Sequence, residues 1–180
     1  ASRCCIVVNT RTLVCILAAL VCSVVRAQEK PRPVSELLQE ASVTIRAVGS
    51  EGSGVLKTRD GVNYVWTAAH VVRGLRSPRE VIDPQSGTKR TIVEFKDASV
   101  IKQLIEDGRT VGKVEFDAEV LRYSDSDSGQ DLALLRIRKK GFATASASFF
   151  LASDIPAPGV ELYHVGSLLG QFGSNSLTSG

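Results

Sequence analysis

Histidine and cysteine are scarce in this sequence of 180 residues, and methionine is absent. The histidines are His70 and His164, so a histidine metal site would need carboxylate ligands, and no local spacing of acidic residues indicates one. We therefore expect neither a metal nor a cofactor. The sequence after residue 27 has no cysteine and hence no disulfide, thiolate nucleophile or cysteine-bound metal, because all four cysteines come earlier: Cys4, Cys5, Cys15 and Cys22.

The first 27 residues contain no acidic side chain and three arginines. An apolar run of 13 residues, Leu13 to Val25, ends directly before Arg26 and Ala27. A positively charged start, a short apolar run and a small residue at the cleavage point are typical of a secretory signal peptide. A membrane anchor is the alternative, but a spanning helix needs about 20 apolar residues. We predict cleavage after Ala27 and a secreted or periplasmic protein with no membrane attachment after cleavage.

An excess of charge is also missing once the signal peptide is set aside. The whole sequence has a formal charge of +3, and without the three leader arginines it has 19 basic and 19 acidic residues. A neutral chain gives no electrostatic reason to expect a nucleic-acid partner. We interpret the basic stretches as solvated loops; they are residues 73–79, 89–90 and 136–140.

Helical periodicity is limited to one short segment, and the rest of the pattern is that of β-strands. Apolar residues at i, i+3, i+4 and i+7 predict an amphipathic helix over 34–41, after a polar connector at 28–33. Residues 97–108 are interpreted as a helical turn or a loop, and Asp60-Gly61 as a hairpin turn. The predicted strands are 43–48, 55–58, 62–67, 91–95, 113–120, 132–137 and 159–166. Many short strands with little helix indicate an all-β barrel or sandwich.

His70 and Asp131 are the side chains with the clearest chemical context. His70 follows Thr67-Ala68-Ala69, where a predicted strand ends in small residues, and Asp131 directly precedes the apolar run 132–137. Alone, each residue has an ordinary structural explanation, as a strand-end histidine and as an acid at the end of a loop. Together they form a candidate pair, because a carboxylate that fixes the tautomer of an imidazole is the orienting half of a nucleophile-base-acid triad.

The blocks around these residues resemble those of trypsin-like serine proteases, most closely the bacterial Deg/HtrA type. The matching blocks are GSGV at 52–55, TAAHVV at 67–72 and DLALLRI at 131–137, and the order of histidine before aspartate is that of the chymotrypsin fold. Residues 165–166 and 177–180 are similar to the stretch that opens the second barrel. The resemblance covers about residues 40–180. It implies a trypsin-like double β-barrel that acts on polypeptide substrates, with His70 as general base and Asp131 as its orienting acid.

The sequence departs from this family in one respect, because no G-[DN]-S-G-G nucleophile block occurs in it. Ser53 and Ser179 are no substitutes, since both lie at the wrong place in the family's order. We therefore expect a fragment that is inactive alone, with the nucleophile after Gly180. The expected organisation is a signal peptide (1–27), a connector (28–33), the first barrel (34–140) and an incomplete second barrel (141–180). Such a fragment should expose an apolar face and unpaired strand edges.

Three further residues have simpler interpretations, and two other functions remain open. We interpret Asp125 and Asp127 as solvated, because they lie in a polar run with no buried strand behind them, and His164 as structural. The main hypothesis is an exported serine endopeptidase, with a possible homo-oligomer of the full-length protein. The alternatives are a non-catalytic trypsin-fold binding or chaperone-like module, and an unrelated β-sandwich binding domain in which His70 and Asp131 would lie far apart.

Overall fold

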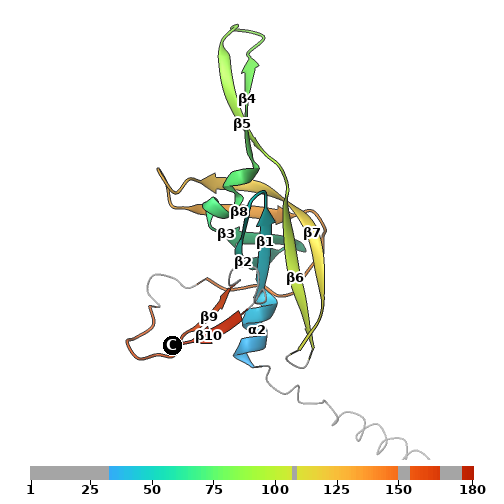
Figure 1. Cartoon of the computed structure of the whole chain (residues 1–180), viewed down its shortest axis with the longest axis vertical. Coiled ribbons are helices and arrows are strands. Elements are labelled where there is room, and N and C mark those ends of the chain that lie inside the picture. The colour runs from blue at the N-terminus through green and yellow to red at the C-terminus, as the bar shows by residue number, and fades with distance from the viewer. Residues whose placement is uncertain (1–32, 107–108, 150–154, 167–175) are drawn as a thin grey trace, which may run out of the picture. The chain divides into compact units, whose positions relative to one another are not determined.

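The computed structural model describes residues 33–106, 109–149, 155–166 and 176–180, so the predicted signal peptide lies outside the described residues. Six antiparallel strands form a closed barrel in the order β1-β2-β3-β8-β7-β6 (Figure 1). Pairing of β1 with β6, in which Ile45 faces Val100, closes it. The expected all-β architecture is therefore a barrel rather than a sandwich. The barrel strands are β1 (Ser42–Ala47), β2 (Ser50–Arg59), β3 (Val62–Thr67), β6 (Ala98–Glu106), β7 (Arg109–Ser124) and β8 (Leu132–Ile137).

Aliphatic side chains fill the inside of the barrel, because alternate residues of a strand point to the same face. Leu56, Val65 and Leu135 are fully buried there on the neighbouring strands β2, β3 and β8. Asn63 is also buried; its side-chain amide donates hydrogen bonds to the Thr58 hydroxyl (2.7 Å) and the Ala143 carbonyl (2.8 Å). The bond to Ala143 holds the segment after β8 against the barrel.

The predicted hairpin turn at Asp60-Gly61 is confirmed. Arg59 of β2 faces Val62 of β3, and the two residues between them have positive φ angles of 52° and 73°. Two consecutive positive φ angles are typical of a type I′ turn, whose twist matches that of the strands it joins. The Asp-Gly pair therefore sets the register of β2 against β3.

The predicted helix over 34–41 is also confirmed, as α2 (Val34–Ala41). Two short strands, β9 (Tyr163–Gly166) and β10 (Ser176–Ser179), form a separate two-stranded sheet, and β9 contacts α2 (Figure 1). The strand predicted over 159–166 is thus shorter than expected, and the stretch 177–180 pairs with it. No helix in the part of the chain that the structure describes is long and apolar enough to cross a membrane.

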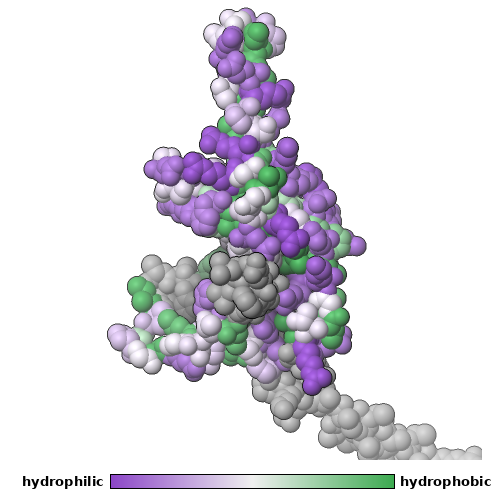
Figure 2. Space-filling model, viewed as in Figure 1, coloured by the Kyte–Doolittle hydropathy of each residue, from purple (hydrophilic) through white to green (hydrophobic). Residues whose placement is uncertain are grey.

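Two of the loop predictions are wrong. Residues 98–106 form β6, and most of the stretch at 73–79, together with 89–90, lies in a hairpin of β4 (Arg76–Ile82) and β5 (Lys89–Phe95). This hairpin projects from the barrel (Figure 1), and hydrophilic side chains predominate along it, with single hydrophobic ones between them (Figure 2). The strand predicted over 91–95 is confirmed as part of β5. Both faces of the hairpin are exposed, so the sequence of β4 carries no burial pattern from which a strand could be predicted.

Candidate active site

Strand order brings the two candidate catalytic residues to the same end of the barrel. β3 and β8 are antiparallel neighbours, with Thr67 facing Ala133. The end of β3 therefore lies beside the start of β8. The short helix α3 (Ala69–Val72) follows β3 and carries His70, and Asp131 directly precedes β8.

His70 and Asp131 make two hydrogen bonds. The ring Nδ1 of His70 lies 2.8 Å from Oδ2 of Asp131, and the backbone N–H of His70 donates to Oδ1 at 2.9 Å. The expected contact between these two side chains is confirmed. Their catalytic role stays a prediction.

The carboxylate and the imidazole differ in exposure, which suits an orienting acid and an accessible base. The Asp131 side chain is 35% exposed and that of His70 is 63% exposed. The hydrogen bond from the His70 ring, followed by that from its backbone N–H, holds the pKa of Asp131 below its usual value. An ionised Asp131 favours the tautomer with the proton on Nδ1, which leaves Nε2 as an acceptor. Among the described residues, no hydrogen bond to this Nε2 is found.

The two glycines of the GSGV block are needed for close packing beside this site. A Cβ at Gly52 would lie 2.5 Å from Cγ2 of Val71, which is the neighbour of His70 on α3. A Cβ at Gly54 would lie 2.4 Å from Val65 and 2.7 Å from Ile45. All three distances are far below the 3.5 to 4.0 Å of an ordinary carbon–carbon contact. Glycine at position 52 therefore lets α3 pack directly on β2.

The interpretation of Asp125 as a solvated acid is wrong. Its side chain is only 18% exposed and forms an ion pair with Arg76 (3.7 Å), and it accepts a hydrogen bond from the Tyr123 hydroxyl (3.2 Å). The backbone N–H of Asp127 also donates to it, and this bond is the main reason why the pKa of Asp125 lies below its usual value. The Asp127 side chain is 71% exposed, as expected of a solvated residue, but forms an ion pair with Arg73 at 3.1 Å. His164 is exposed on β9.

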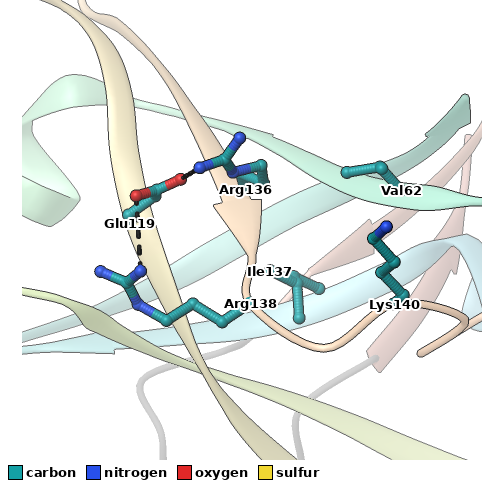
Figure 3. A pocket seen from close by; sticks show the side chains of 6 residues that line it. All are labelled: Val62, Glu119, Arg136, Ile137, Arg138 and Lys140. Carbon is teal, nitrogen blue, oxygen red and sulfur yellow. Dashed lines mark ion pairs between the residues drawn. The ribbon is translucent and has the colours of Figure 1, made fainter.

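Basic residues at the other end of β8 line a small pocket of about 190 Å³ (Figure 3). Its Glu119 carboxylate lies between the guanidinium groups of Arg136 and Arg138 and pairs with both. Arg138 also donates two hydrogen bonds to Asp97, at 2.6 and 2.9 Å. The stretch 136–140 is therefore not simply a solvated loop: two of its cations are neutralised by carboxylates of the barrel.

Apolar side chains are exposed on the outside of the barrel, next to the His70–Asp131 pair. Leu132, which follows Asp131, is 38% exposed, and Phe149 is 57% exposed. The Phe149 ring meets Trp66 edge to face, with 6.0 Å between the ring centroids. Together, Trp66, Leu132 and Phe149 line a hollow of about 300 Å³. The described part of the chain thus exposes apolar surface, as expected, but its barrel is closed and has none of the unpaired strand edges that were also expected.

Comparison with models of protein families and with curated proteins found no match for this chain. No group of three or more histidine, aspartate or glutamate side chains in the described segments is placed to hold a metal ion. A function for this chain therefore has to be inferred from its own residues. Of these, His70 and Asp131 form the arrangement with the most specific chemistry.

Proposed function

We propose that this chain is part of an exported trypsin-like serine endopeptidase, to which it contributes the general base and the orienting acid. The observation that carries the proposal is the double hydrogen bond between His70 and Asp131. A single ion pair between exposed side chains would be weak support. A carboxylate that binds both the ring and the backbone of one histidine fixes the orientation of the imidazole, which is what a catalytic base requires.

The chemistry assigned to the pair follows from its hydrogen bonds. Nδ1–H of His70 donates to the ionised Asp131, so Nε2 is free to accept the proton of a serine hydroxyl as that oxygen attacks a peptide carbonyl. The imidazolium that forms is stabilised by Asp131 and then protonates the leaving amine. Water repeats the same steps to release the acyl group. The side-chain exposure of His70, 63%, is compatible with a substrate and a nucleophile that approach from outside the barrel.

Two features support the trypsin-like assignment in particular. The closed barrel with the pair at one end is the architecture that the resemblance implies for a first barrel. The apolar surface at Trp66, Leu132 and Phe149 adjoins the pair, where a second barrel would cover it. Sequence after Gly180 would then supply the nucleophilic serine, the oxyanion hole and the substrate pocket. The proton of that serine would pass to His70.

The test is a measurement on the protein encoded by the whole gene. A fluorophosphonate probe should label one serine located after Gly180, and peptide-bond hydrolysis should be lost on the His70→Ala change. Asp131→Asn should lower kcat by about 10⁴-fold, because the wrong imidazole tautomer is then favoured. Arg79→Gln, on the hairpin, is the control and should leave kcat unchanged. Full activity of the Asp131→Asn protein would refute the assignment.

The missing nucleophile block favours a second candidate, a non-catalytic binding or chaperone-like module of the same fold. In that case the whole gene would encode a second barrel without a G-[DN]-S-G-G block, and the probe would label nothing. The protein should then suppress the aggregation of an unfolded polypeptide. The sequence that follows Gly180 distinguishes the two candidates directly.

A further inference from the structure

Two arginines connect the backbone after His70 to the loop before Asp131. Arg73, in the single 3₁₀ turn η1 (Arg73–Leu75) after α3, donates a hydrogen bond to Oδ2 of Asp127 at 3.1 Å. Arg76, the first residue of β4, pairs with Asp125 at 3.7 Å. We call Arg73 and Arg76 the arginine clamp. It ties the two segments that carry the dyad to each other, outside the dyad itself.

The loop that the clamp holds, residues 124–130, is also closed on itself directly before Asp131. The Ser124 hydroxyl accepts a hydrogen bond from the backbone N–H of Gln130 at 2.9 Å. A Cβ at Gly129 would lie 2.2 Å from that same hydroxyl, so the turn closes this tightly only with glycine there. Because Gln130 is the neighbour of Asp131, a displacement of this loop is passed on to the Asp131 carboxylate.

The loop 124–130 also has indirect contact with the base of the β4–β5 hairpin, through Tyr123. The rings of Phe95, on β5, and Tyr123, on β7, lie 5.1 Å apart, and the Tyr123 hydroxyl donates to Asp125. Asp125 thereby has partners on three sides: Tyr123, the Asp127 backbone and Arg76. The half-buried Asp125 therefore makes most of the contacts that hold the loop, and the more exposed Asp127 adds one ion pair, with Arg73.

We propose that Arg73 and Arg76 are positioning residues that keep Asp131 in hydrogen-bonding contact with His70. This proposal rests on the proposed function for its catalytic meaning, but it concerns the geometry of the pair alone. Neither arginine touches the His70 ring or a reacting atom; both act through the loop 124–130. Exposed ion pairs have small effects individually, so the expected effect of losing one is a change of about threefold in the population of the open dyad.

The test uses the imidazole signals of the full ¹⁵N-labelled chain, which has only two histidines. His164→Gln identifies the His70 resonances, and Asp131→Ala, which removes the acceptor, gives the exchange rate of the His70 ring N–H when the dyad is broken. We expect Arg73→Gln and Arg76→Gln each to raise this exchange rate about threefold, and the double variant about tenfold, which is the product of the two effects when each ion pair holds the loop independently. Arg73→Lys should recover part of the difference, since it keeps the charge but not the guanidinium geometry.

The matched control is Arg79→Gln. Arg79 pairs with Glu94 at 2.6 Å, and its side chain is 57% exposed, against 53% for Arg73, but the pair lies on the hairpin away from the loop. A second control, Asp97→Asn, breaks the Arg138 ion pair at the other end of β8. It should lower the thermal stability without altering the His70 signal. This control separates a positioning effect from general destabilisation.

Each outcome decides the proposal. A clamp variant with faster exchange than both controls supports it, and clamp variants that match the wild-type chain overturn it. If Asp131→Ala itself leaves the exchange rate unchanged, no dyad exists in solution, and both the clamp and the basis of the proposed function are lost. If the clamp variants loosen the dyad but the whole-gene protein is not labelled by the serine probe, the proposed function fails while the positioning role of the arginines stands.

Discussion

The packing of α3 on β2 makes Gly52→Ala the most informative single change in this protein. The added Cβ would lie 2.5 Å from Cγ2 and 3.0 Å from Cγ1 of Val71. Valine is branched at Cβ and has little freedom to turn its methyl groups away. An ordinary carbon contact needs 3.5 to 4.0 Å, so α3 must move outward by about 1 Å. The His70–Asp131 hydrogen bond, 2.8 Å long, would then exceed the usual upper limit of about 3.2 Å.

The expected result is a loss of stability together with a loss of the dyad. Overpacking of this kind costs about 1 to 3 kcal/mol in the free energy of unfolding, measured by urea denaturation. The exchange rate of the His70 Nδ1 proton should also rise, because the hydrogen bond to Asp131 is lost. Both effects should be partly reversed by Val71→Ala in the same chain, with a coupling energy of about 0.5 to 3 kcal/mol, because that change removes the two methyl groups.

Gly112→Ala is the matched control, since Gly112 is also a strand glycine. A Cβ there would have Leu104 as its nearest neighbour, at an ordinary 3.7 Å. The same substitution should therefore be neutral or stabilising by up to about 1 kcal/mol, because alanine restricts the unfolded chain. If Gly52→Ala proves as stable as Gly112→Ala and keeps the His70 signal, then α3 does not pack tightly against β2 at Gly52.

Three further changes test the barrel. Leu135→Ala removes a fully buried side chain and should cost about 2 to 5 kcal/mol in the free energy of unfolding; a cost below 1 kcal/mol would contradict a closed, filled barrel. Gly61→Ala places a side chain at a φ of 73° and should cost about 1 to 2 kcal/mol, so an unchanged stability would argue against the type I′ turn. The hydrogen bonds from Arg138 lower the pKa of Asp97 in the folded protein. The ionised carboxylate therefore stabilises the fold at every pH above its unfolded pKa of about 3.9. This contribution is lost as the pH falls through the lower pKa of the folded state. The free energy of unfolding, measured by urea denaturation at several pH values, should therefore fall less on acidification in Asp97→Asn than in the unchanged chain. An identical pH profile for the two proteins would refute a stabilising role of the Asp97 carboxylate.

The elements that the sequence predicts well are those specified by neighbouring residues. The turn at Asp60-Gly61 is fixed by two adjacent residues that tolerate positive φ, and α2 by an apolar stripe within eight positions. β8 is an apolar run that follows a polar loop. The contact of His70 with Asp131 was also predictable, but only through the resemblance, because it depends on β3 and β8 being neighbours in the sheet.

Strands that depart from the simple alternation of apolar and polar residues were missed. β6 places Lys102 half inside the protein, where burial lowers the pKa of its ammonium group, and it buries Val100 and Ile101 in succession. Its sequence therefore lacks a clean period of two. β4 is held by cross-strand pairs such as Arg79 with Glu94 and has almost no buried side chain. A charged strand with two exposed faces looks like a loop in the sequence.

The role of Asp125 could not be predicted, because its partners come from distant parts of the chain. Arg76 lies 49 positions earlier, on another strand, and the sequence near Asp125 is uniformly polar. A polar run is ordinarily solvated, but here η1 and the start of β4 bring Arg73 and Arg76 to its carboxylates. Long-range charge pairs of this kind depend on the tertiary arrangement rather than on a local pattern.

The backbone of Asp131 gives an independent reason to regard its contact with His70 as more than a chance ion pair. Two non-glycine residues of the described segments have positive φ, Asp60 and Asp131, at 52° and 49°. The first lies in a two-residue hairpin turn that requires this conformation. Asp131 lies at the start of a strand, where no such turn accounts for it. Strained backbone persists where surrounding contacts impose it, and such positions concentrate at functional sites. The two hydrogen bonds from His70 hold the Asp131 side chain. An aspartate tolerates the left-handed region, and its side chain is short enough to reach the ring and the backbone N–H of His70 at once.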